Sequence, residues 1–306
     1  MSTPGTTPRD ERLAQILLFI TPAMFTTNMV MARATSDFIP PVALAFWRWS
    51  GVCLLLALFC GRELWRQRKA IRQEAGQFLV LGFLGMVVCG AGVYWGAAST
   101  TATNIGLIYA TSPVIIILLS RLWFGEAMTL RQGIGTALAL SGVLVIVLKG
   151  DIDVLHSLSF SLGDLLMLAA AIAWAIYAVL LKRWPSRLSV NGRLAGITGA
   201  GALLLLPALL LEGALAGPPV WDNRTLLVVA TLIIVPGIGA YGTYSYMTKH
   251  LGPSRTGLIL YLSPIYTALM AWALLGEHFA FYHWIGSALV LPGLYIATHK
   301  PQPETA

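Results

Sequence analysis

Two polar side chains stand inside long apolar runs, where a polar group is costly unless it has a partner. Arg48 follows Phe46-Trp47 early in one run, and Asn28 lies well inside another. A buried arginine can bind a carboxylate through two parallel hydrogen bonds; the alternatives are reaching back to a membrane interface or bonding backbone carbonyls. Asn28 must face protein or water rather than lipid. Both are therefore candidates for a ligand site, with an interhelical hydrogen bond as the alternative for Asn28.

Aromatic side chains away from the ends of the apolar runs form a second candidate group. Their positions are not those of interfacial anchors, which gather at run ends. Trp174 and Tyr177 are three residues apart and so share one face of a helix. We expect this group to line a cavity, with core packing as the alternative. The group comprises Tyr94, Tyr109, Trp174, Tyr177, Tyr241, Tyr244, Tyr261 and Tyr266.

Two prolines, Pro113 and Pro264, each stand about nine residues into an apolar run. Proline removes a backbone hydrogen bond and kinks a helix. Interrupted helices at equivalent places in two repeats indicate the binding region of a transporter. We therefore expect Pro113 and Pro264 to be hinges; the alternative is the general enrichment of proline in membrane helices.

The titratable residues are placed unfavourably for catalysis or proton transfer within a membrane. The 13 Asp and Glu residues and the five His residues lie in the tails, in the polar separators or near the ends of apolar runs. Proton relays in membranes are built from buried carboxylates and histidines. No Walker A motif, metal-ligand cluster or Ser/His/Asp set at one depth is present. We expect no cofactor, no metal and no enzymatic activity.

The amino-acid composition indicates in which class of protein these residues must be positioned. Of the 306 residues, 57% are hydrophobic and 11% charged, and the mean hydropathy is +0.75. Soluble proteins carry roughly 45–50% apolar and about 25% charged residues, so a soluble globular domain is excluded. Disorder is excluded too, because it requires low hydrophobicity.

Ten apolar runs are long enough to cross a bilayer, which takes about 20 residues. The sequence therefore predicts an all-α integral membrane fold with ten transmembrane helices. The runs are Leu13–Ala32, Val42–Cys60, Gln77–Ala97, Asn104–Phe124, Gln132–Leu148, Leu162–Leu181, Gly192–Leu211, Thr225–Met247, Thr256–Leu275 and His283–Thr298.

The basic residues predict the orientation of these spans. Lys and Arg are retained on the cytoplasmic side during insertion. If the N-terminus is cytoplasmic, 15 of the 20 Lys and Arg residues fall in cytoplasmic segments and three in external ones. A miscounted span would destroy this asymmetry. We expect both termini in the cytoplasm, and we attribute the net charge of +7 to membrane orientation rather than to nucleic-acid binding.

An internal repeat divides the chain at an offset of 151 residues. Ser112-Pro113 matches Ser263-Pro264, and Gly125-Glu126 matches Gly276-Glu277. The match continues without a gap into the following run. Each half holds five spans, and an odd number inverts the second half relative to the first. Inverted repeats are typical of secondary transporters. We expect residues 1–149 and 150–306 to form two inverted five-helix repeats around a central cavity.

The repeated GLI…SP…GE block, the ten spans and the Phe46-Trp47-Arg48 motif resemble the EamA family of the drug/metabolite transporter superfamily. Within it the chain looks most like the YddG-type bacterial amino-acid exporters. The resemblance covers nearly the whole chain. It implies a secondary transporter of the bacterial inner membrane that exports amino acids, aromatic ones among them, by alternating access.

Two other functions stay open. The first is an efflux carrier for hydrophobic drugs or other metabolites, although cationic drugs would favour an intramembrane acid. The second is a membrane-embedded enzyme, which would need clustered catalytic groups. The expected partners are a small-molecule substrate and the lipid bilayer, with the chain a monomer or weak homodimer. Without a buried acid or histidine, we expect transport without proton coupling.

Overall fold

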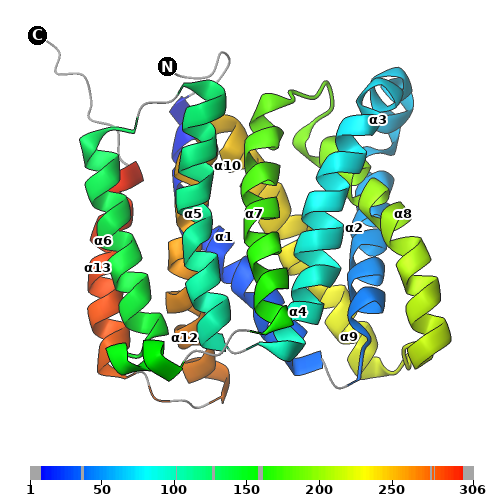
Figure 1. The fold of residues 1–306 in the computed structure, drawn as a ribbon. Coiled ribbons are helices and arrows are strands. Elements are labelled where there is room, and N and C mark those ends of the chain that lie inside the picture. The colour runs from blue at the N-terminus through cyan, green and yellow to red at the C-terminus, as the bar shows by residue number, and fades with distance from the viewer. Residues whose placement is uncertain are drawn as a thin grey trace, which may run out of the picture.

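A computed structural model describes residues 8–35, 38–100, 102–125, 128–157, 161–275, 278 and 280–298. Within these ranges all regular structure is helical, which confirms the predicted all-α class. The helices pack side by side into one bundle (Figure 1). Helix α1 begins and α13 ends at the same end of that bundle, the upper end in Figure 1.

The first half of the chain supplies five helical stretches, of which the third changes helix type along its length. A π-helical segment, η1, interrupts that stretch between two α-helices. The elements are α1 (Pro8–Thr35), α2 (Pro41–Arg66), α3 (Arg68–Gly82) with η1 (Phe83–Gly92) and α4 (Val93–Ser99), α5 (Ala102–Phe124) and α6 (Leu130–Val147).

A 3₁₀ turn, η2 (Ile152–Ser157), precedes the second half, which again has five helical stretches. Its third stretch also contains a π-helical segment, η3, and its fourth a 3₁₀ segment, η4. The elements are α7 (Leu162–Arg183), α8 (Val190–Ala216), α9 (Asn223–Leu232) with η3 (Ile233–Ala240) and α10 (Tyr241–Leu251), α11 (Pro253–Gly257) with η4 (Leu258–Leu262) and α12 (Ser263–Leu275), and α13 (Phe281–Thr298).

Seven of the described helical stretches are long and apolar enough to cross a membrane. Three more, namely α1, the stretch from α11 to α12, and α13, coincide in order and position with the remaining predicted spans. The charged segment 61–75, which lies between the second and third predicted spans, is also largely helical, because α2 continues to Arg66 and α3 begins at Arg68. Its Arg, Glu and Gln residues are good helix formers.

Side-chain caps fix where several helices begin. Thr129, Ser161, Ser189 and Asp222 each accept a hydrogen bond from a backbone amide in the first turn that follows. Such caps satisfy amides that have no partner within the helix. The Thr225 amide also holds the pKa of the Asp222 carboxyl below its usual range. These polar residues mark the helix starts that hydropathy alone places imprecisely.

Helices α6 and α13 make the same glycine contact twice. A Cβ atom on Gly135 would lie 2.6 Å from the carbonyl oxygen of Gly293, and one on Gly142 would lie 2.6 Å from that of Gly286. At the 151-residue offset, Gly135 matches Gly286 and Gly142 matches Gly293. Each glycine therefore contacts the repeat counterpart of the other one. This is the pattern of two antiparallel helices related by a two-fold axis. The small residues let the backbones touch.

Helices α2 and α8 also contact each other reciprocally, through a glutamate near the end of each helix. Glu63, near the end of α2, accepts hydrogen bonds from the amide and hydroxyl of Ser189, 2.5 and 2.7 Å away, at the start of α8. Glu212, near the end of α8, accepts from the amides of Val42 and Ala43, 3.0 and 2.7 Å away, at the start of α2. Each helix therefore caps the other, which places opposite ends of α2 and α8 together.

The two hinge candidates lie in different local structures despite their match in sequence. Pro113 is buried in the middle of α5, which runs through it without a break. Pro264 is the second residue of α12, directly after the 3₁₀ segment η4. The repeat is therefore less symmetric here than its sequence indicates.

Candidate functional site

Arg48, Asn28 and Tyr94 come together from three helices. The Arg48 Nη1 atom donates to the Asn28 Oδ1 atom at 2.7 Å and to the Tyr94 hydroxyl at 3.0 Å. The Tyr94 hydroxyl also donates to Asn28 Oδ1 at 2.7 Å. Arg48 is only 1% exposed, so it does not reach the interface, and its partners are side chains rather than backbone carbonyls.

The hydrogen-bonding capacity of Arg48 is only partly used. Its Nε and Nη2 atoms are buried without a hydrogen-bond partner, and so is the neighbouring Trp49 Nε1 atom. The guanidinium carbon lies 4.1 Å from the Trp49 ring centroid and 5.7 Å from that of Tyr241. Aromatic faces attract a cation but do not accept these N–H groups in the plane of the guanidinium. An anion with two oxygens would satisfy both.

An aromatic cluster lies beside Arg48. Its rings come from α1, α2, α7 and α10, and Trp49 joins it to Arg48, with its ring centroid 4.8 Å from that of Tyr241. Trp174 stacks on Tyr177 at 5.4 Å and lies 4.8 Å from Tyr244. We call the set Phe25, Trp49, Trp174, Tyr177, Tyr241 and Tyr244 the aromatic cluster.

Four of the eight predicted aromatic residues thus belong to one site, and Tyr94 is hydrogen-bonded to Arg48. Tyr109 is half-buried against the same core and lies close enough to Tyr94 and Tyr241 to interact with them electrostatically. The remaining two lie elsewhere. Tyr261 belongs to a separate core between α5, α6, α13 and η4. The Tyr266 hydroxyl donates to the Phe19 carbonyl at 2.5 Å and ties α12 to α1.

Phe25 and Trp49 belong to the site although sequence reasoning did not select them. Phe25 precedes Asn28 by three residues, which places both on one face of α1. Trp49 directly follows Arg48. Their neighbours in sequence were therefore the available signal.

The Tyr241 hydroxyl links the site to a π-helical segment. It donates to the Gly85 carbonyl at 3.1 Å. Tyr241 is the first residue after η3, and Gly85 lies within η1. Single π turns inside α-helices are frequent at functional sites. The contact therefore joins the irregular segments of the third and eighth stretches next to the aromatic cluster.

Among the charged side chains that the structure describes, Arg48, Asp164 and Glu74 are buried. Asp164 is the third residue of α7 and Glu74 the seventh of α3. Glu74, for example, accepts from Ser186 and from the Arg187 amide at one end of the bundle. Over the same residues, no group of three His, Cys, Asp or Glu side chains is placed to hold a metal ion.

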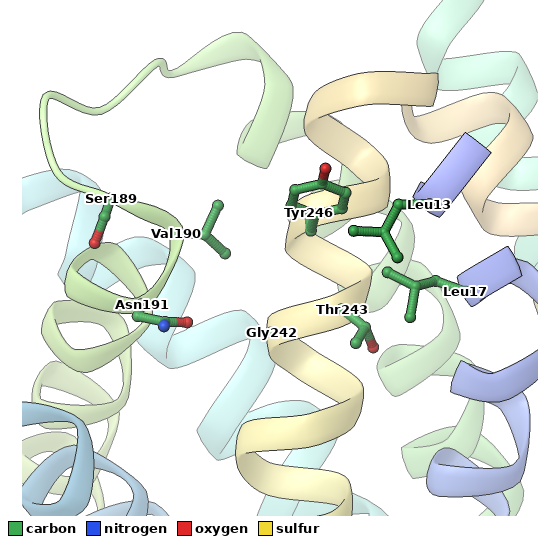
Figure 2. A pocket seen from close by; sticks show the side chains of 8 residues that line it. All are labelled: Leu13, Leu17, Ser189, Val190, Asn191, Gly242, Thr243 and Tyr246. Atoms are coloured by element: carbon green, nitrogen blue, oxygen red, sulfur yellow. The ribbon is translucent and has the colours of Figure 1, made fainter. Parts of the chain in front are cut away.

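A separate pocket of 420 Å³ opens at the end of the bundle where α1 begins. Figure 2 shows α10 as its floor, with α8 on one side and α1 on the other. None of the predicted site residues lines it. The lining residues are Leu13, Leu17, Ser189, Val190, Asn191, Gly242, Thr243 and Tyr246.

Together, the apolar helices, the two-fold contacts and the buried polar site define a multi-pass membrane protein of the transporter class. Comparison with known proteins agrees with this class. The model of the EamA-like transporter family matches twice, over residues 12–148 and 161–298. The chain belongs to this family, as its sequence motifs predicted.

Relatives are named as transporters but not assigned a substrate. An "Uncharacterized transporter" of Archaeoglobus fulgidus is 27% identical over 288 residues, which cover 93% of this chain and 97% of the relative. The "Uncharacterized transporter YyaM" of Bacillus subtilis is 26% identical, over 88% of each chain. One solved crystal structure superposes with a TM-score of 0.74 at 21% identity, covering 93% of this chain and 97% of that one. This last similarity concerns the fold alone.

Proposed function

We propose that this transporter exports amino acids with aromatic or other apolar side chains across the bacterial inner membrane. One observation carries the proposal: a fully buried arginine whose Nε and Nη2 atoms have no hydrogen-bond partner stands beside a cluster of aromatic rings. A buried cation is costly without a counter-charge. A carboxylate brought by the substrate would supply that counter-charge.

The aromatic cluster supports the apolar half of the proposal. Aromatic side chains of a substrate would contact these rings edge-on or stacked, as the rings now contact each other. The buried Tyr177 and Tyr244 hydroxyls have no well-formed hydrogen bond in this conformation and are available to a polar substrate group. A hydrophobic cation would instead meet the like charge of Arg48, which disfavours cationic drugs as substrates.

The site residues come from both halves of the chain, which supports alternating access. Asn28, Arg48 and Tyr94 belong to the proposed first half, residues 1–149. Trp174, Tyr177, Tyr241 and Tyr244 belong to the proposed second half, residues 150–306. Substrate sites at the interface of inverted repeats open to either side when the halves rock. We propose the same movement here.

We further propose that export is driven by the substrate gradient alone. Arginine stays charged at all relevant pH values, and a tyrosine with a reference pKa of about 10 is a poor proton shuttle near neutrality. The carboxylates described in the structure lie near helix ends. Glu126 and Glu277, which we consider the strongest objection, lie outside the described residues.

Counterflow in proteoliposomes tests the substrate. Labelled amino acids with aromatic and branched side chains should exchange, whereas the matching amines without the carboxylate should not. Arg48→Gln should lower amino-acid exchange at least tenfold. Arg121→Gln is the matched control, because Arg121 is an exposed arginine near a helix end, and it should exchange like the parental protein. Exchange of amines or of lipophilic cations in place of amino acids would contradict the proposal.

Coupling is tested in the same vesicles. An imposed pH gradient should neither drive accumulation nor change the initial rate. If the gradient does drive accumulation, and Glu126→Gln or Glu277→Gln abolishes it, transport is proton-coupled and this part of the proposal is wrong.

A further inference from the structure

Asp10 and Asp164 occupy the same place in the two halves of the chain. Each is the third residue of the first helix of its half, Asp10 in α1 and Asp164 in α7. Equivalent helix starts of an inverted repeat lie at opposite ends of the bundle. Figure 1 shows α10 near the upper end, where α1 begins, and α4 at the lower end. The two carboxylates therefore stand at the two ends of the molecule.

Each carboxylate accepts a hydrogen bond from the third helical stretch of the other half. The Tyr246 hydroxyl, in α10, donates to Asp10 Oδ1 at 2.9 Å. The Thr100 hydroxyl, directly after α4, donates to Asp164 Oδ1. The two bonds are thus counterparts in the repeat, and each joins the proposed first half to the proposed second half.

The end that holds Asp164 is closely packed. Asp164 is 3% exposed, and its other oxygen accepts from the amide and the hydroxyl of Ser161 at 2.6 and 3.1 Å. A Cβ atom on the preceding Gly163 would lie 2.6 Å from the carbonyl oxygen of Gly96, so the backbones of α7 and α4 touch. A passage between these helices therefore requires them to separate, which breaks the bond from Thr100 to Asp164.

The end that holds Asp10 is packed more openly. Tyr246 lines the 420 Å³ pocket of Figure 2, and both Tyr246 and Asp10 are half-buried. A Cβ atom on Gly242, one turn away along α10, would meet no atom within 4 Å. Deeper in the bundle, the Thr21 hydroxyl donates to that of Thr243 at 2.8 Å and again joins α1 to α10. Two side-chain bonds thus hold α1 against α10 beside an open pocket.

We propose that these two carboxylates form the gates of the transporter. The bond from Thr100 to Asp164 closes the end where α7 begins, and the bond from Tyr246 to Asp10 closes the end where α1 begins. The transport cycle breaks one bond at a time, so the aromatic cluster opens to one side while the other side stays sealed. By the expected topology the first gate is external and the second cytoplasmic. This proposal rests on the alternating access proposed above, but not on the identity of the substrate.

The accessibility of Cys89 tests the gates. Cys89 is buried in η1, close enough to Tyr177 and Tyr241 of the aromatic cluster to interact with them electrostatically. In a background without Cys53 and Cys60 it is the sole thiol. A membrane-impermeant maleimide then reports from which side the cluster is reached, in right-side-out and inside-out membrane vesicles without substrate.

Two variants each remove one gate hydroxyl and little else. Thr100→Val should raise the rate of Cys89 labelling from the external side at least about fivefold, because the closed state loses a bond to a charged group. Tyr246→Phe should raise labelling from the cytoplasmic side to a similar extent. The matched controls are Thr231→Val, where the hydroxyl donates within its own helix, and Tyr295→Phe, at an exposed position. Both should label like the parental protein.

A second arm does not depend on either hydroxyl deletion. Thr100→Cys combined with Asp164→Cys replaces the external bond with a disulfide that forms on mild oxidation and opens on reduction. Oxidation should abolish labelling of Cys89 from the external side and leave cytoplasmic labelling, and reduction should restore external labelling.

Three results would overturn the proposal: labelling that neither hydroxyl deletion changes, labelling that rises from the same side in both variants, or external labelling that persists after oxidation. Amino-acid counterflow is a separate measurement. A wrong substrate would leave these labelling results unchanged, and wrong gates would leave counterflow by the parental protein unchanged.

Discussion

A buried guanidinium without a carboxylate partner dominates the chemistry of the candidate site. The side chains around Arg48 reduce the cost of its burial without neutralising it: Asn28 and Tyr94 accept hydrogen bonds, and Trp49 and Tyr241 present ring faces. Such an environment holds a charge ready for a ligand. It also explains why a polar amide stands in α1 at a position that hydrocarbon would disfavour.

Asn28→Asp should weaken the binding of a substrate carboxylate at Arg48. The new carboxylate would lie where Asn28 Oδ1 now lies, 2.7 Å from Arg48 Nη1. The present bond already has a charged donor, so the substitution adds the attraction between two opposite charges at short range. We expect a higher unfolding temperature and a KM for amino acids raised at least tenfold.

Thermal unfolding in detergent and concentration-dependent counterflow measure the two effects of Asn28→Asp. Asn191→Asp makes the same change at an exposed position and should alter neither quantity. A parental KM in Asn28→Asp would show that Arg48 is not the anion site.

The sequence indicated most of these residues but not their grouping. Arg48, Asn28 and the Trp174–Tyr177 pair stood out because polar and aromatic groups are unusual in the middle of apolar runs. Which of them meet depends on how α1, α2, α4, α7 and α10 rotate about their axes. A helix in lipid shows little periodic contrast between its two apolar faces, so the sequence could not assign Tyr261 to a different core. Phe25 could have been found only through its spacing of three residues from Asn28.

At the level of elements, the π-helical segments are the clearest departure from regular spans. η1 and η3 occupy nearly equivalent places in the two halves and contain several glycines. Apolar composition alone does not distinguish a π-helix from an α-helix, and hydropathy therefore predicted two uniform spans. The bond from Tyr241 to Gly85 shows that these segments support each other.

Tyr241→Phe should loosen η1. Removing the hydroxyl leaves the Gly85 carbonyl without that bond, at a net cost of about 1 kcal/mol. We expect faster hydrogen exchange in peptides covering residues 83–92 and a lower transport rate. Tyr266→Phe also deletes a tyrosine–carbonyl bond, to Phe19, and should leave exchange in residues 83–92 unchanged. Equal exchange in both variants would mean that the Tyr241 bond does not support η1.

The two prolines should differ in effect because their local structures differ. Alanine at 113 restores a backbone amide in the middle of α5, which should straighten the helix. Alanine at 264 falls where η4 already interrupts the regular pattern. We expect Pro113→Ala to slow counterflow several-fold and Pro264→Ala to stay within about twofold of the parental rate. If Pro264→Ala is the slower variant, Pro113 is not the principal hinge.

At the level of the whole molecule, the two-fold relation was predictable from the repeat, because glycine and Ser-Pro pairs match at one offset. What the offset could not provide was the pairing of α6 with α13 and of α2 with α8. That pairing depends on contacts between helices that are more than 100 residues apart in sequence.

Topology is testable with single cysteines in a background without Cys53, Cys60 and Cys89. Arg68→Cys, at the start of α3, and Asp153→Cys, in η2, are both at exposed positions. The excess of basic residues near Arg68 predicts that it faces the cytoplasm. Membrane-impermeant thiol reagents should label Arg68→Cys from the cytoplasmic side and Asp153→Cys from outside. Labelling of both from one side would contradict the ten-span topology.

The exchanged caps of α2 and α8 have a consequence for biogenesis. A chain emerging from the ribosome inserts α2 before Glu212 has been synthesised. The Val42 and Ala43 amides at the start of α2 precede Glu212 by 170 and 169 residues, so they lack this hydrogen-bond acceptor until α8 has been made. Glu63 likewise lacks its hydrogen-bond donor, the Ser189 amide, until the start of α8 has been made. The two helices thus complete each other only after translocation of the second half has begun. In a nascent first half, the amides at the start of α2 therefore have no carboxylate partner until α8 has been made.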